Sequence, residues 1–206
     1  MSPRWPAHHS FCGCCAARRI KGSGEKVYAM HIVIREADRE TIHYLQIGDS
    51  SFEVKSKLVL NAENGRITYT VQDVPPYTKQ YGPEEVEPES YINDPDKGVF
   101  FAWLGDKVIG QIRLRRFWNG YAYIDDISVD PDYRGEGIGR ALIEHAIAWA
   151  KEKGFPGLML ETQDNNVAAC RLYARCGFEL RGFDTHLYKA QDPSRDEVAL
   201  YWYLVF

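Results

Sequence analysis

A glycine-rich stretch between a strand pattern and a helix pattern constrains the fold of this chain more than any other feature. It reads VDPDYRGEGIGR and ends at Arg140, after an alternating apolar strand pattern over 121–129. Helical periodicity follows at once over 138–151, and Gly154 is placed to end that helix. Backbone N–H groups at a helix N-terminus lack partners, and glycines let the backbone approach phosphate oxygens closely. We therefore predict a diphosphate site here, with added charge from Arg134 and Arg140.

Other phosphate-binding motifs match this stretch less well. A P-loop ends in Gly-Lys followed by Ser or Thr, whereas Gly139 precedes Arg140 and Ala141. A dinucleotide-binding turn needs G-x-G-x-x-G within a parallel βαβ unit, but the spacing here is G-x-G-x-G. Glu161 lies where such a fold places its acidic residue, yet the strand-rich first half does not suit that architecture. A plain glycine-rich turn without a ligand is the structural alternative.

The remaining patterns predict an α+β (mixed α/β) domain with a mostly antiparallel sheet flanked by helices. Turns are expected at Asn64-Gly65 and Gly105-Asp106, and a break is expected at Val74-Pro75-Pro76-Tyr77. We predict strands over 30–35, 66–71, 99–104, 108–113, 121–129, 158–162, 186–189 and 198–206, helices over 37–47, 138–151 and 167–176, and an acidic loop or short helix over 81–96.

Composition narrows the classes of partner. The 206 residues carry a net charge of -4, with 45% hydrophobic and 26% charged residues, which is typical of one globular domain. Because no basic block is present, we expect no nucleic acid partner. We also expect no membrane span, because no apolar run is long enough to cross a bilayer. A mildly acidic chain suits a cationic substrate. The sequence leaves the oligomeric state open, with a homodimer as one alternative.

The first 26 residues differ from the rest and contain His8, His9, Cys12, Cys14 and Cys15. Adjacent cysteines fit poorly with spaced zinc ligand pairs, so we predict a disordered extension over 1–26, no metal, and one domain over 27–206. The total of five cysteines is odd and forms no disulfide framework, which favours the reducing cytoplasm. Met30 as the true start stays an open alternative.

Two segments resemble the GNAT acetyltransferases. Residues 134–139 (RGEGIG) are similar to the family's R-x-x-G-x-G signature, and residues 166–178 resemble its N-x-x-A-x-x-L-Y-x-x-x-G-F segment. Residues 76–79, 118–119, 160–174 and 199–203 are similar to the streptothricin acetyltransferases within that family. The resemblance implies a GNAT fold, acetyl-CoA as cosubstrate, and a cationic small-molecule amine as acceptor.

The resemblance also implies roles for individual residues. The diphosphate would be held mainly by main-chain N–H groups of Arg134, Gly135, Glu136, Gly137, Ile138, Gly139 and Arg140, and the pantetheine arm would pair with Ile127, Ser128 and Val129. Asn166 would bond to the CoA arm, although a helix cap is the competing interpretation. Tyr173 would act as general acid, since a phenol with a pKa of about 10 can protonate a leaving thiolate whose thiol has a pKa of about 8.5; a core aromatic is the alternative.

The acceptor side depends on carboxylates placed within apolar strands. Alternation sends Asp125 and Asp126 to opposite faces and puts Asp125 on the face of Ile127 and Val129. We therefore favour Asp125 as base or ammonium anchor, ahead of Asp126, with Glu161 as the second candidate and a water-relayed base as another. Salt bridges from the aspartates to Arg113, Arg115 or Arg116 are the structural alternative.

Aromatic side chains around these strands are candidates for the wall of the acceptor pocket, because their faces attract cations. They are Trp118, Tyr121, Tyr123, Tyr201, Trp202 and Tyr203. Ordinary packing is the alternative for most of them. The leading function is acetylation of a streptothricin-type antibiotic. A protein N-terminus, a lysine side chain or a polyamine is the rival acceptor, and a non-catalytic acyl-CoA-binding sensor is the alternative from another class.

Overall fold

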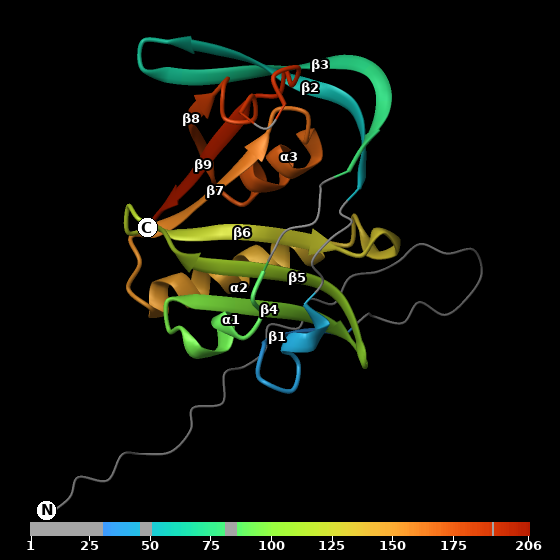
Figure 1. The fold of residues 1–206 in the computed structure, drawn as a ribbon, viewed down its shortest axis with the longest axis vertical. Helices are drawn as coiled ribbons and strands as arrows, with labels where there is room; N and C mark the ends of the chain where they lie inside the picture. Colours follow the sequence, from blue (N-terminus) through green and yellow to red (C-terminus); the bar gives the residue numbers. More distant parts are fainter. Residues whose placement is uncertain (1–30, 46–50, 81–85, 191) are drawn as a thin grey trace, which may run out of the picture.

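The computed structural model describes residues 31–45, 51–80, 86–190 and 192–206 (Figure 1). Its strands and helices follow in the order β1 Ile32–Glu36, the 3-10 turn η1 Ile42–Tyr44, β2 Phe52–Glu63, β3 Arg66–Lys79, α1 Ser90–Asn93, β4 Lys97–Leu104, β5 Lys107–Arg116, β6 Ala122–Val129, the 3-10 turn η2 Pro131–Tyr133, α2 Ile138–Glu152, β7 Gly157–Gln163, α3 Val167–Arg175, β8 Glu179–Asp184 and β9 Ala199–Val205.

Seven of the strands form one sheet in the order β1-β4-β5-β6-β7-β9-β8. Every neighbouring pair in it is antiparallel except β6 and β7, which are parallel because α2 connects them. Helices flank the sheet, so the predicted α+β architecture with a mostly antiparallel sheet is confirmed.

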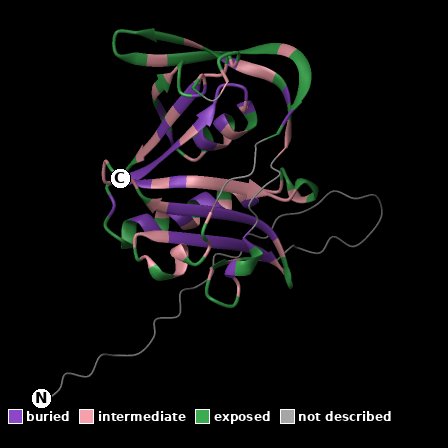
Figure 2. Cartoon of the chain, viewed as in Figure 1, coloured by how far each residue is buried: buried purple, intermediate pink, exposed green. Residues whose placement is uncertain are grey.

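The two faces of the sheet bury different cores. Alternate residues of β4 show this, because Phe100 and Ala102 join the large core beneath α2 and α3, whereas Phe101 and Trp103 join a smaller cluster with η1. We call these the α2 face and the α1 face, since Tyr91 of α1 packs against the smaller cluster. The buried positions concentrate in the central strands and on the inward side of α2 (Figure 2).

A separate two-stranded ribbon, β2 paired with β3, lies beside β8 and α3 (Figure 1). Its turn at Asn64 and Gly65 confirms the sequence prediction, and both residues have positive φ, as a two-residue hairpin turn requires. The sequence analysis assigned no element to β2. The predicted break at Pro75 and Pro76 is wrong as a strand end: these prolines lie in a register shift inside β3, where no ladder N–H is needed.

Two other predicted elements are also corrected. Residues 186–189 form a turn and not a strand, because the strand β8 begins directly after the helix stop at Gly177 and ends at Asp184. Within the described part of the predicted helix over 37–47, only η1 is helical, and the Asp38 carboxylate caps the turn before it by accepting from the Thr41 N–H.

Residues 1–26, with the histidines and cysteines considered for zinc, lie outside the described residues. Within the described ranges, no helix is both long enough and apolar enough to cross a membrane. The same part of the chain holds no group of three or more His, Cys, Asp or Glu side chains in a metal-binding arrangement.

Candidate active site

The candidate site begins where β6 and β7 separate. The two parallel strands pair only from Ala122 to Ile124 on β6, and from Leu158 to Leu160 on β7. Beyond these positions the strands diverge, as Figure 1 shows, and no described strand pairs with β6 residues 125–129 on the β7 side. The backbone N–H and C=O groups of that edge are therefore available to an extended ligand, apart from the Val129 carbonyl, which accepts from Arg134.

The glycine-rich turn closes the far end of this opening. Gly135 and Gly137 both have a φ of 85°, a left-handed conformation that other residues adopt only with strain. Gly137 is the N-cap of α2 and makes no side-chain cap, so the first N–H groups of the helix keep their capacity to bind an anion.

Two arginines of this turn serve local contacts. Arg134 donates from Nε to the Val129 carbonyl oxygen at 3.1 Å, and Arg140 donates from Nε to Glu144 at 2.7 Å. Both arginines and Glu144 are exposed, so these contacts are weak and a bound anion can compete for either guanidinium.

A β-bulge on β6 changes the expected direction of its acidic side chains. Arg113 of β5 lies opposite Asp126, and the next residue, Leu114, lies opposite Ile124. Asp125 is thus an extra residue without a partner in the ladder. A bulge places two consecutive residues against one on the neighbouring strand and interrupts the alternation of side chains.

Both aspartates therefore reach partners on the α1 face. Asp126 accepts from Gln111 Nε2 at 2.9 Å. Asp125 accepts from Arg115 Nε at 2.8 Å and from the Tyr91 hydroxyl at 3.3 Å. The predicted alternative of a salt bridge to an arginine is what the structure shows for Asp125.

The hydrophobic neighbours of the aspartates lie on the other face. Ile124 is in the large core beneath α2, and Ile127 and Val129 pack against the same core. The prediction that Asp125 and Asp126 lie on opposite faces is therefore wrong, and so is the prediction that Asp125 shares a face with Ile127 and Val129, because the bulge adds one residue between Ile124 and Ile127. The edge of β6 toward β7 nevertheless contains Ile127, Ser128 and Val129, as the cofactor assignment requires.

Glu161 lies on β7 at the point where that strand leaves β6. It stands opposite Tyr201 of β9 in the ladder and accepts a hydrogen bond from the Tyr188 hydroxyl. Burial raises the pKa of Glu161, while the Tyr188 hydrogen bond and the positive charge of Lys79 act in the opposite direction. Among the described residues, none forms an ion pair with this carboxylate.

Tyr123 lies near both candidate carboxylates. Burial raises the pKa of its hydroxyl, and the negative charges of Glu161 and Asp125 raise it further. Its ring stacks on Phe117 with centroids 4.5 Å apart, and the Arg115 guanidinium lies 5.1 Å from its centroid. Asp125 differs from Glu161 in its partner. Burial raises the pKa of the Asp125 carboxyl, and the guanidinium of Arg115 partly offsets this rise.

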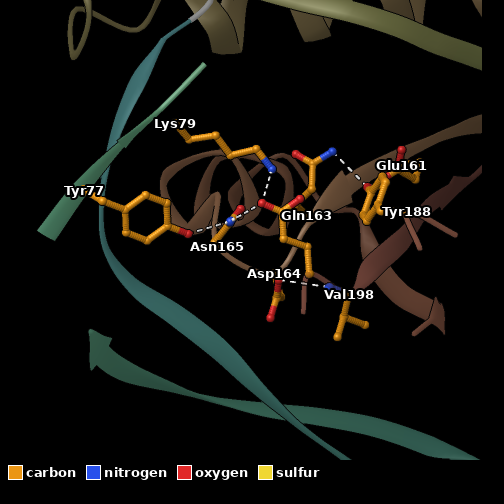
Figure 3. Close-up of polar contacts among 9 residues, drawn as sticks. Tyr77, Lys79, Glu161, Gln163, Asp164, Asn165, Tyr188 and Val198 are labelled. Atoms are coloured by element: carbon orange, nitrogen blue, oxygen red, sulfur yellow. Dashed lines mark hydrogen bonds and ion pairs between the residues drawn. The ribbon is translucent and has the colours of Figure 1, made fainter. Parts of the chain in front are cut away.

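A polar network fixes the strand that carries Glu161 (Figure 3). Lys79, at the end of β3, forms an ion pair with Glu197 at 2.5 Å, and Asn165 donates to the same carboxylate at 3.0 Å and to the Tyr77 hydroxyl at 2.9 Å. Lys79 and Asn165 are buried. Residues 76–79, which resemble the streptothricin acetyltransferases in sequence, thus pack against the segment after β7, which resembles them as well.

The helix α3 carries Tyr173 and begins at Asn166. The Asn166 side chain accepts from the Ala169 N–H at 3.2 Å, so the competing interpretation as a helix cap is confirmed. Tyr173 belongs to the core on the α2 face, as the alternative of a core aromatic predicts, and its ring centroid lies 6.0 Å from that of Phe178 and 6.4 Å from that of Trp202.

The aromatic wall is only partly assembled as predicted. Trp202 is 1% exposed and belongs to the core on the α2 face, so the structure contradicts its place in a substrate wall. Strand alternation instead turns Tyr201 and Tyr203 toward the α1 face, where Tyr203 meets Tyr121 edge to face at 5.4 Å. Trp118 is 86% exposed and lies outside this wall.

Sequence reasoning missed three partners of the carboxylates, namely Tyr91, Tyr188 and Lys79. No local pattern marks Tyr188 as a partner of Glu161, because the two residues are 27 positions apart. Tyr188 also lies in the segment 186–189, which the sequence analysis assigned to a strand. Arg115 was named only as an alternative partner of the aspartates.

Comparison with known proteins agrees with this geometry. Residues 68–178 match the model of the Acetyltransferase (GNAT) family. Streptothricin acetyltransferase A of Bacillus subtilis is 44% identical over 156 residues, which is 75% of this chain and 89% of that protein.

Two solved structures are similar over most of their length. A protein from Bacillus anthracis assigned as a streptothricin acetyltransferase, in complex with acetyl coenzyme A, has 47% identity and a TM-score of 0.77 over 86% of this chain and 98% of its own. A nourseothricin acetyltransferase has 31% identity and a TM-score of 0.70 over 84% and 98%. With the separated β6 and β7 strands and the glycine turn before α2, these matches establish that the chain belongs to the GNAT acetyltransferase family.

Proposed function

We propose that this enzyme transfers the acetyl group of acetyl-CoA to a primary amine of a streptothricin-type antibiotic. The observation that carries the proposal is the edge of β6 that no described strand pairs with, which runs from the carboxylates at the centre of the sheet to the glycine turn at α2. Relatives that are similar over most of this chain have streptothricin acetylation in their names, and one was solved with acetyl coenzyme A.

The cofactor would lie along the opening between β6 and β7. The main chain of Ile127, Ser128 and Val129 pairs with the amide groups of the pantetheine arm, as an added strand would. The N–H groups of the turn 134–140 bind the diphosphate, and the α2 dipole favours its negative charge. This arrangement brings the thioester to the point where β6 and β7 part, between Asp125 and Glu161.

The amine would approach from the α1 face, and Glu161 is the better candidate for its anchor and base. Asp125, which the sequence favoured, is already neutralised by Arg115 and hydrogen-bonded by Tyr91. Glu161 is largely buried, and among the described residues its hydrogen-bond donor is a hydroxyl, so a substrate ammonium would supply the missing positive charge.

The chemistry follows from the charge of the groups involved. A lysine-like ammonium has a pKa of about 10.4 and must lose a proton before its nitrogen can attack the thioester carbonyl. Glu161 takes that proton directly or through water, and burial favours this step by raising the pKa of the carboxyl. The nitrogen attacks the thioester carbonyl to form the C–N bond, and the C–S bond breaks as Tyr173 donates a proton to the leaving sulfur. The nitrogen then loses its second proton to solvent, and solvent returns a proton to Tyr173.

We also place the enzyme in the cytoplasm. The described cysteines, Cys170 and Cys176, are free thiols, and free thiols are usual in a reducing compartment. Burial raises the pKa of both thiols, so neither is primed for oxidation.

The function is tested with acetyl-CoA and a panel of amines, read by thiol release and by the mass of the product. We expect the antibiotic to gain one acetyl group. Turnover only with peptides or only with polyamines would favour those acceptors instead. Tight binding of CoA without any turnover would identify a sensor.

Gly137→Ala should weaken CoA binding about tenfold, because a Cβ at this left-handed position costs about 1–2 kcal/mol and deforms the turn. Isothermal titration calorimetry with CoA measures the effect. Gly65→Ala is the matched control, since Gly65 has a φ of 74° at the distant tip of the ribbon. Equal CoA affinity in both variants would contradict the diphosphate assignment.

Tyr173→Phe should lower kcat about a hundredfold or more while the affinity for acetyl-CoA changes little, because the variant keeps the ring and removes the proton donor. Steady-state kinetics together with calorimetry separate the two quantities. Unchanged kcat would remove Tyr173 from the reaction.

Glu161→Gln should lower kcat/KM for the amine about a hundredfold and abolish the acidic limb of its pH profile. The limb falls above the ordinary carboxyl range, because burial raises the pKa of Glu161 and the base works only when deprotonated. Asp125→Asn is the matched control and should keep the limb. If Asp125→Asn removes the limb and Glu161→Gln does not, the two assignments are reversed.

A further inference from the structure

Tyr188 connects the segment between β8 and β9 to the centre of the site. It is buried, and its phenol oxygen contacts two side chains of β7 (Figure 3). The hydroxyl donates to Glu161 Oε1, and the oxygen accepts from Gln163 Nε2 at 2.8 Å. Glu161 and Gln163 are two residues apart on one strand, so their side chains share the α1 face.

The chemistry of these groups fixes the direction of the hydrogen bonds. An amide nitrogen can only donate, so the phenol oxygen must accept from Gln163. Its single proton is then directed to Glu161, where a carboxylate oxygen accepts it. One oxygen of Glu161 is thereby committed to Tyr188, and an ammonium can bind to the other.

We propose that Tyr188 is a positioning residue, which holds Glu161 as a carboxylate and orients its Oε2 toward the ammonium group of the acceptor. The inference rests on the proposed function, because it assigns the partner that orients the proposed base. Tyr188 itself touches neither acceptor nor cofactor in this scheme and acts through Glu161 alone.

The segment that carries Tyr188 is anchored at its other end as well. Glu197 forms the buried ion pair with Lys79, and the Val198 N–H donates to Asp164 Oδ1 at 3.1 Å. Contacts to β3 and to the residue after β7 therefore hold the end of the segment before β9, in addition to the Tyr188 contacts with β7. Such support limits the freedom of the phenol ring, which is what a residue that orients a carboxylate requires.

The hydrogen bond opposes the effect of burial on the base. Burial raises the pKa of Glu161, and the Tyr188 hydrogen bond lowers it by stabilising the charged form. Removal of the hydroxyl should therefore raise the pKa of Glu161 and move the acidic limb of the pH profile upward. A merely structural role for Tyr188 would not shift this limb.

Tyr188→Phe tests the proposal, because it keeps the ring and removes only the donor. We expect the KM for the amine to rise about ten- to hundredfold, the range for loss of a hydrogen bond to a charged group, and the acidic limb of kcat/KM to move to higher pH. The affinity for CoA should stay unchanged. The acceptor in these assays is whichever amine the unmodified enzyme acetylates in the panel.

Tyr69→Phe is the matched control, since Tyr69 lies on β3 and its ring packs against Trp202, with centroids 6.1 Å apart, on the α2 face. It should leave the acidic limb in place. Gln163→Met is a second test that applies even if Tyr188→Phe does not fold, because it frees the phenol to turn away from Glu161. We expect a smaller shift of the limb in the same direction.

Wild-type amine KM and an unshifted acidic limb in a folded Tyr188→Phe variant would overturn the inference and leave the proposed function intact. Equal losses of CoA affinity and amine affinity would also overturn it, since they indicate general distortion. If the unmodified enzyme acetylates no amine in the panel, the proposed function itself fails, and the role of Tyr188 in orienting a base fails with it.

Discussion

The site depends on the loss of strand pairing between β6 and β7 after Ile124 and Leu160. Backbone groups in a sheet interior normally satisfy one another, so a sheet that opens at its centre leaves a row of donors and acceptors without partners. The parallel connection through α2 makes the opening possible, because the helix starts at the end of β6 and returns the chain to the start of β7. The same connection places the N-terminus of α2 at the open end.

The bulge at Asp125 then decides which side chains of β6 lie on each face of the sheet beside the opening between β6 and β7. One extra residue turns both aspartates to the α1 face, where Arg115 neutralises Asp125. The α2 face keeps only apolar side chains of β6, and these hold the strand on its core. Because the charged side chains of β6 lie on the α1 face and its apolar side chains on the α2 face, the strand can line a polar site while the core stays shielded from water.

Glu161 contrasts with Asp125 although both carboxylates are largely buried. The guanidinium of Arg115 compensates the charge of Asp125. The Tyr188 hydroxyl and the more distant Lys79 only partly compensate the charge of Glu161. An incompletely compensated carboxylate in a partly dry environment attracts a cation and holds a proton more readily than an exposed one. This difference in surroundings, and not the residue type, separates a structural acid from a candidate base.

Local sequence determined the glycine turn, α2, α3 and most strands, because their periodicity, helix stops and turn residues act over a few neighbouring positions. The assignment of Ile127, Ser128 and Val129 to the cofactor edge of β6 came from the resemblance to the GNAT acetyltransferases and not from the local pattern. Tertiary structure alone decided the faces of Asp125 and Asp126, the burial of Trp202, the path of β3 through its prolines and the contact of Tyr188 with Glu161. Each of these depends on a bulge, a sheet neighbour or a contact across many residues, and such long-range packing leaves no periodic signal in the chain.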